Sequence, residues 1–181
     1  MALRIKDGYS FKADAVANEF LVIPGAANSV TPMKLQKLVY FAHGWYLGLT
    51  DMPLVAEPIQ AWKYGPVIQS IYREFKGFGS DFISRLARDV RPVGDDDVEE
   101  CTPRVADTAV DAPFVTDLIS RMWKLYGKHT AAELSTMTHQ AGTPWHTIYS
   151  KFNRNGQIYS GIDIPNELIR DYFKKQLRKP T

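Results

Sequence analysis

The chain has 181 residues, 45% of them hydrophobic, and its 22 lysines and arginines against 20 aspartates and glutamates give a net charge of +2. This length supports one buried core, and the net charge is too small to attract nucleic acid by bulk electrostatics. The single cysteine, Cys101, excludes an internal disulfide, and the chain has neither an apolar run of membrane-spanning length nor a secretory signal. We therefore expect one cytoplasmic domain over residues 1–181, with no membrane partner.

Two helices are predicted near the start of the chain. One covers residues 11–21, where the apolar positions share a face, and Pro24–Gly25 ends it. The other covers residues 32–48 and starts at Thr31–Pro32, because threonine can cap free backbone amides and proline presets the first helical φ. Its apolar side chains recur at spacings of three and four over a wide arc, so this helix is expected near the centre of the domain.

One strip of that central helix lacks large aliphatic side chains and carries Lys37, Tyr40, Gly44 and Gly48. The two glycines lie one turn apart, so another backbone can approach the helix closely there. Lys37 then needs water or an acidic partner, because lysine is almost never fully buried unless it is paired.

The middle of the chain is predicted to be less regular. Pro53 and Pro58 bracket residues 54–57, and residues 59–62 alternate weakly, which favours a short edge strand or an extended loop within residues 54–63. Gly65–Pro66 then restarts a helix that runs to about Phe75 before two glycines stop it. Residues 80–110 lose the helical period and gain charges, so we predict a loop there, with at most one short strand within residues 87–105.

Four more helices are predicted in the second half. Residues 111–127 have the clearest amphipathic pattern, and the capping box Thr-Ala-Ala-Glu at residues 130–133 starts a helix that runs to about His139. Thr143–Pro144 starts one or two further turns, and Pro165 opens the last helix.

These elements predict a mainly α fold. We expect a compact single-domain bundle of six to seven helices, with a short extended element at residues 54–63 and a second candidate at residues 87–105. The acidic run within residues 95–100 and the basic end at residues 170–179 are predicted to be solvated surface.

The sequence predicts no catalytic, cofactor or metal site. It has no nucleophile elbow, phosphate-binding loop or dinucleotide fingerprint, and acidic neighbours disfavour thiolate chemistry at Cys101. The histidines do not pair at the one-turn spacing of metal ligands; they are His43, His129, His139 and His146. For His43, a hydrogen-bonded structural role is favoured over proton transfer.

The segment least like ordinary core is Trp62-Lys63-Tyr64. Side chains alternate along an extended segment, so one aromatic ring can be buried while the other anchors a partner. Equally, both rings can clamp the following Gly-Pro turn onto the core.

Thr138–His139 and Pro144–Trp145 form a second cluster. They can line a polar pocket. Bridging of loop backbone groups is the more typical role of short polar side chains near helix ends, so the structural interpretation is favoured.

Three motifs resemble a known family. Residues 33–47, which read Met-Lys-Leu-Gln-Lys-Leu-Val-Tyr-Phe-Ala-His-Gly-Trp-Tyr-Leu, are similar to the opening signature of the Panacea, or SocA-like antitoxin, family. The likeness continues through residues 53–75, although Gln60 stands where an acidic residue is often expected, and through residues 134–145. Because the motifs keep their order and separation over about residues 32–149, the resemblance is specific.

This resemblance implies a protein that neutralises a cognate protein toxin by direct binding and has no enzymatic role. Some members of the family also deliver the toxin to a cellular protease. A homodimer is compatible with the sequence of this chain. The expected partner-binding residues are Lys34, Lys37, Tyr40, Trp62, Lys63 and Tyr64. The expected structural signature is Gly65, Pro66, Thr138, His139, Pro144 and Trp145.

Two alternatives stay open. A small hydrolase-like enzyme would need a pocket with a histidine as general base, formed by His43, Tyr64, Thr138 and His139. A DNA-binding regulator would contact phosphates with its basic C-terminal helix, through Lys174, Lys175, Arg178 and Lys179. Nucleic acid ranks last as a partner, because no reading helix is recognisable and the net charge is small.

Overall fold

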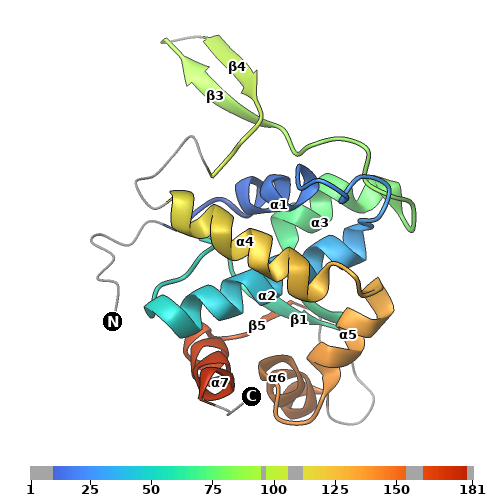
Figure 1. The fold of residues 1–181 in the computed structure, drawn as a ribbon, viewed down its shortest axis with the longest axis vertical. Helices are drawn as coiled ribbons and strands as arrows, with labels where there is room; N and C mark the ends of the chain where they lie inside the picture. The colour runs from blue at the N-terminus through green and yellow to red at the C-terminus, as the bar shows by residue number, and fades with distance from the viewer. Residues whose placement is uncertain (1–9, 95–96, 106–111, 154–160, 179–181) are drawn as a thin grey trace.

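The computed structural model describes residues 10–94, 97–105, 112–153 and 161–178, and Figure 1 shows helices packed around a central helix. The helices are α1 (Ala13–Leu21), α2 (Pro32–Thr50), α3 (Gln69–Phe75), α4 (Ala112–Tyr126), α5 (Ala131–His139), α6 (Pro144–Phe152) and α7 (Asn166–Leu177), with a 3-10 turn, η1 (Lys76–Phe78). The strands are β1 (Ile59–Trp62), β2 (Gly65–Ile68), β3 (Asp89–Val93), β4 (Asp97–Cys101) and β5 (Ile162–Asp163). The fold is mainly α, as predicted.

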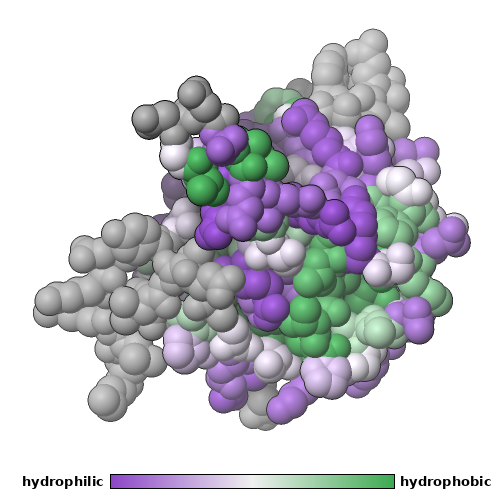
Figure 2. Space-filling view, turned by 90° about the horizontal axis from the view of Figure 1, so that it is seen from above, coloured by the Kyte–Doolittle hydropathy of each residue, from purple (hydrophilic) through white to green (hydrophobic). Residues whose placement is uncertain are grey.

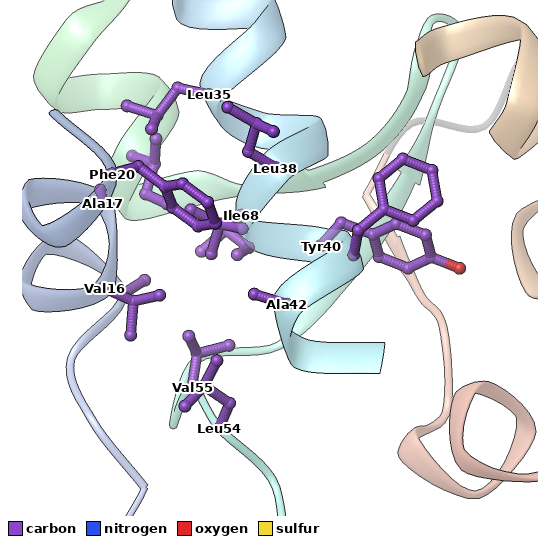
Figure 3. Close-up of a cluster of buried hydrophobic side chains, with 14 of the residues drawn as sticks. Val16, Ala17, Phe20, Leu35, Leu38, Tyr40, Ala42, Leu54, Val55 and Ile68 are labelled. Atoms are coloured by element: carbon purple, nitrogen blue, oxygen red, sulfur yellow. The ribbon is translucent and has the colours of Figure 1, made fainter. Parts of the chain in front are cut away.

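Helix α2 is the central element. Thr31 caps it by accepting a hydrogen bond from the Lys34 backbone N–H at 3.3 Å, which confirms the predicted start. Figure 3 shows Leu35 and Leu38 of α2 in one fully buried cluster with Phe20 of α1 and Ile68 of β2. Because α2 is covered on several sides, it has no broad solvated face.

The glycine strip of α2 is covered by α7. A β-carbon on Gly44 would lie 2.1 Å from Phe173 Cε2, and one on Gly48 would lie 3.1 Å from Phe173 Cβ and 3.2 Å from its carbonyl carbon. The predicted close approach is therefore confirmed. The sequence did not indicate what this close approach means for Tyr40. The Tyr40 ring packs edge-on against Phe173, and Tyr40 is only 2% exposed.

A three-stranded antiparallel sheet lies beside α2 in the order β2-β1-β5. The predicted helix from Gly65–Pro66 is wrong at its start, because Gly65–Ile68 pairs with β1 in the register Ile59↔Ile68 and Trp62↔Gly65. All four β2 residues are buried, and such a continuous apolar run does not distinguish strand from helix. The predicted edge strand is instead the central strand, since the two-residue β5 pairs with its other side.

Strands β3 and β4 form a hairpin that projects from the helical body (Figure 1), where one short strand at most was predicted. Figure 2 looks down on this end of the molecule and shows mostly hydrophilic side chains beside a hydrophobic area. Cross-strand ion pairs join Arg91 to Glu99 and Arg88 to Glu100. The predicted solvated acidic run is therefore partly paired, and its residues 95–96 lie outside the described residues.

Two buried polar side chains of α1 hold the irregular segment that leads into and out of this hairpin. Asn18 donates to the Ala87 carbonyl at 3.1 Å and accepts from its N–H at 2.7 Å. Glu19 binds the Arg104 guanidinium through both oxygens at 2.9 Å. These partners are about 70 to 85 positions away in the chain, so no local pattern could indicate them.

The helices of the second half follow the predicted boundaries closely. The reciprocal capping box of Thr130 and Glu133 is present, and Thr143 caps α6. Helix α6 has nine residues, which is slightly more than the predicted one or two turns, and the predicted start of the earlier helix at residue 111 lies outside the described residues. Leu177 is 46% exposed in the last turn of α7, although the apolar positions of this helix mostly face inward.

Replacing Asp14 by asparagine should stabilise the protein in a pH-dependent way. Burial, and next the charge of Glu57, raise the pKa of Asp14 from 3.8 to about 6, and its buried Oδ1 has no hydrogen-bond partner among the residues that the structure describes. The folded state thus disfavours the ionised form of Asp14. The resulting loss of stability is fully present at a pH above the pKa in the folded state, and it is absent at a pH below the pKa in the unfolded state. After discounting for partial exposure, we expect a gain of about 1 kcal/mol above the folded pKa.

The measurement is chemical unfolding of Asp14→Asn and the parent protein across this pH window, with Asp81→Asn on an exposed loop as the control. The gain should fade as the pH drops from about 6 to 3.8. A gain that stays constant down to the lower pH would refute the electrostatic explanation.

Candidate partner-binding site

A partly open cavity of about 500 Å³ lies at the start of α2, beside the β1–β2 turn and α3. Its wall is largely aromatic and apolar, with basic groups among these side chains. The lining residues are Pro32, Met33, Gln36, Lys37, Trp62, Lys63, Tyr64, Val67, Tyr72, Lys76 and Gly79. Its size and composition are those of a site that accepts a small ligand or a side chain of a partner.

The two aromatic rings of the β1–β2 turn have different surroundings. Trp62 packs against Tyr72 with ring centroids 4.9 Å apart, and its Nε1 donates to Gln60 Oε1 at 3.1 Å. Tyr64 is 64% exposed. The interpretation in which both rings clamp the turn onto the core is therefore wrong, and one ring is held while the other faces outward.

Lys37 is 1% exposed, and its Nζ donates to the Pro66 carbonyl at 3.0 Å. Among the described residues no carboxylate pairs with it, so a backbone carbonyl stands where an acidic partner was one of the two expected possibilities. Burial lowers the pKa of its ammonium group to about 7. Gly65 makes room for this side chain, since a β-carbon there would lie 2.7 Å from Lys37 Cε and 2.9 Å from Thr138 Oγ1.

The predicted partner-binding residues divide into two groups. Lys37, Trp62, Lys63 and Tyr64 line the same cavity. Lys34 does not: it is 7% exposed, and its Nζ donates to the Gly127 carbonyl at 2.7 Å and lies 5.4 Å above the Trp123 ring. Lys34 and Tyr40 are not available to a partner, because Lys34 is buried beside Trp123 of α4 and Tyr40 is buried against Phe173 of α7.

Side chains of α5 and α6 hold the main chain of the β1–β2 turn. Trp145 Nε1 donates to the Trp62 carbonyl at 2.8 Å, and Ser135 Oγ donates to the Tyr64 carbonyl at 3.0 Å. His139 Nε2 lies 3.3 Å from the carbonyl oxygen of Lys63. With the bond from Lys37 to Pro66, the turn is fixed at four carbonyls.

The predicted signature residues therefore act on backbone groups. Thr138 Oγ1 donates to the Ser135 carbonyl at 2.7 Å, and Thr143 Oγ1 donates to the Thr138 carbonyl at 2.6 Å. The His139 ring packs on Trp145 with centroids 3.8 Å apart. This supports the structural interpretation of the Thr138–His139 cluster over a polar pocket.

Sequence reasoning missed Gln36, which binds β2 to α2. Its Nε2 donates to the Ile68 carbonyl at 3.0 Å, and its Oε1 accepts from the Ile68 N–H at 2.9 Å. The sequence feature that could have indicated this role is the single side-chain amide of Gln36 among the apolar residues of the helix. Tyr72 and Lys76 of the cavity wall were also missed, although they lie four residues apart at the end of a helix.

The surroundings of His43 do not form the hydrolase pocket. His43 is fully buried, its Nδ1 accepts from the Val55 N–H at 3.3 Å, and its Nε2 lies 3.0 Å from Asn166 Oδ1. Burial lowers its pKa to about 4, so the ring is neutral and its role is structural, as favoured. Neither His43 nor His139 lines the cavity.

The basic end is partly neutralised. Lys174 and Arg170 of α7 pair with Asp51 at the end of α2, and Arg170 also binds Asp171. Residue 179 lies outside the described residues. Within the described ranges, no three His, Cys, Asp or Glu side chains are grouped so that they could hold a metal ion, and no helix has the length and apolar character needed to cross a membrane.

Comparison with known proteins agrees with the resemblance in the sequence. The family model of the SocA-like antitoxin, Panacea domain, matches residues 35–146, an interval that contains the cavity lining except Pro32 and Met33. The curated Antitoxin SocA of Caulobacter vibrioides (strain NA1000 / CB15N) is 32% identical over 182 residues, which cover 94% of this chain and 87% of that protein. No solved structure is significantly similar. The chain therefore belongs to the family of SocA-like antitoxins that carry the Panacea domain.

Proposed function

We propose that this protein is an antitoxin that neutralises a cognate protein toxin by direct binding, with the contact centred on the β1–β2 turn and the cavity beside it. The observation that carries the proposal is the fixed main chain of this turn, which presents the exposed Tyr64 next to an apolar cavity. The membership of the antitoxin family supplies the class of partner.

The fixed turn favours binding for an energetic reason. A loop that is ordered on binding loses conformational entropy, which reduces affinity, whereas a loop already held by hydrogen bonds loses little. Tyrosine and tryptophan also offer large contact areas at a small cost in side-chain entropy, and they are enriched in the residues that dominate binding energy. Trp62 and Tyr64 are aromatic residues of this type, and they are carried by the fixed main chain of the turn.

The test is co-expression with the product of the neighbouring gene. We expect that this product alone arrests growth, that co-expression restores growth, and that the two chains co-purify as a stoichiometric complex. Absence of both rescue and complex would overturn the proposal. The toxin concentration separates two modes of action: it stays constant if binding alone neutralises the toxin, and it falls in a protease-dependent way if the antitoxin acts as an adaptor.

Tyr64→Ala should weaken the complex without destabilising the antitoxin. Truncation of an aromatic anchor typically costs about 2 kcal/mol or more, so we expect a Kd at least tenfold higher by calorimetry. The melting temperature should not change, because Tyr64 is largely exposed. Phe82→Ala is the matched control, since Phe82 is 50% exposed and does not line the cavity. Equal losses in both variants would show that the turn is not the contact.

A further inference from the structure

We propose that the cavity binds an acidic apolar segment of the partner: an apolar side chain enters against the aromatic wall, and a neighbouring carboxylate is held by the Lys37 ammonium group, with Lys63 and Lys76 beside it. This inference rests on the proposed function for the identity of the partner as a protein. It adds the chemical character of the partner segment, which is acidic and apolar, and the residue that binds its carboxylate, Lys37.

The charge of the cavity wall is of one sign. Lys37, Lys63 and Lys76 line it, and the lining that the structure describes contains no aspartate or glutamate. Within the described part of the chain, none of these three lysines forms an ion pair, whereas Arg91 and Arg121 on other surfaces do. Cations of one sign along a cleft with apolar walls concentrate their field and favour an anionic ligand.

Lys37 is the buried basic group of the cavity wall, and a neighbouring anion would favour its charged form. An ammonium group has three donors, and among the described residues Lys37 has one acceptor, the carbonyl of Pro66. A buried ammonium group lowers the stability of the free protein because its charge is removed from bulk water, and a methionine of similar length would avoid this cost. A carboxylate in the cavity would accept from its other donors through short, charge-assisted hydrogen bonds.

The apolar part of the wall indicates that the ligand has an apolar group in addition to a carboxylate. Met33, Trp62, Val67 and Tyr72 surround a volume of about 500 Å³, which is many times that of a carboxylate group. These side chains gain free energy only when apolar surface covers them. The combination therefore selects an apolar side chain next to an acidic group on the same segment.

The test uses the full chain and two small probes of equal shape, phenylacetate and the neutral phenylacetamide. Binding is followed by NMR of the lysine side chains and the Trp62 indole. We expect saturable shifts at Lys37 and Trp62 with phenylacetate, and an affinity for the amide at least about tenfold lower, as for the loss of a charged hydrogen bond. The pKa of Lys37, lowered by burial to about 7, should rise in the phenylacetate complex.

Lys37→Met should abolish the preference for phenylacetate, and because it also removes the hydrogen bond to the Pro66 carbonyl, its melting temperature is measured to show that the variant is folded. Lys34→Met is the matched control: Lys34 is also buried on α2 and bound to a backbone carbonyl, but it lies outside the cavity lining. This variant should keep the preference. Equal affinities of the parent protein for the two probes, no saturable binding, or a preference that survives in Lys37→Met would each overturn the inference.

Co-expression with the toxin separates this inference from the proposed function. If the parent antitoxin restores growth, we expect Lys37→Met to restore it poorly and Lys34→Met to restore it fully. A parent protein that neither rescues nor forms a complex overturns the proposed function, whereas the probe measurements still decide the chemistry of the cavity. Full rescue by Lys37→Met together with an unselective cavity overturns only the inference.

Discussion

Gly44→Ala should lower the free energy of unfolding by about 3 kcal/mol, because the new methyl group occupies the position of the Phe173 ring. The added β-carbon would lie within 2.1 to 2.5 Å of three atoms of that ring, and Phe173 is only 2% exposed, so the ring cannot move aside without displacing α7. Alanine is the better helix former by about 1 kcal/mol, which offsets only part of this loss.

The measurement is thermal and chemical unfolding, in which we expect the melting temperature to fall by roughly 10 °C. Gly77→Ala is the control, since nothing lies within 4 Å of a β-carbon there and its φ is not positive. A neutral or stabilising result for Gly44→Ala would show that α7 is not seated on α2 as described. Loss of α7 would also remove Asn166 from His43, because the two side chains meet at 3.0 Å.

Gly65→Ala should have a similarly large effect and should also disrupt the candidate site. Gly65 has a φ of +107°, a backbone conformation that non-glycine residues rarely adopt and that costs about 1–3 kcal/mol. A β-carbon at this position would also lie 2.7 Å from Lys37 Cε and 2.9 Å from Thr138 Oγ1. We expect a combined loss of about 3–4 kcal/mol and loss of phenylacetate binding, since Lys37 has to shift.

Gly142→Ala separates the two contributions to that loss. Gly142 also has a positive φ, +84°, but nothing lies within 4 Å of a β-carbon there. This variant should therefore lose only the backbone contribution, and the difference between the two variants measures the contact with Lys37 and Thr138. If both variants lose equal stability and both keep probe binding, Gly65 does not act by making room for Lys37.

The clamp on the β1–β2 turn has a consequence for partner recognition. The hydrogen bonds from Lys37, Ser135 and Trp145 all go to main-chain carbonyls of the turn. Main-chain acceptors do not depend on which side chains the turn carries. The conformation of the turn is thus separated from the chemistry of the side chains at residues 63 and 64, which under the proposed function decide which partner fits.

Much of the helical framework is determined by the sequence alone. The caps at Thr31 and Thr143 and the capping box at residues 130–133 were predicted correctly, because each depends on hydrogen bonds between residues at most four positions apart. The glycines of α2 also indicated the close approach of another element, although nothing in their spacing indicated that this element is α7. The motifs at residues 33–47, 53–75 and 134–145 were sufficient to identify the family.

Only the tertiary structure decided which side chains form the site. Lys37 and Tyr40 belong to one helical strip, yet α7 covers Tyr40 while Lys37 lines the cavity beside the β1–β2 turn. That turn is held by Ser135, His139 and Trp145, which are 71 to 83 positions away from their carbonyl partners. Helix caps form within one turn of chain and leave a local pattern, whereas burial of a lysine depends on which distant segments pack over it.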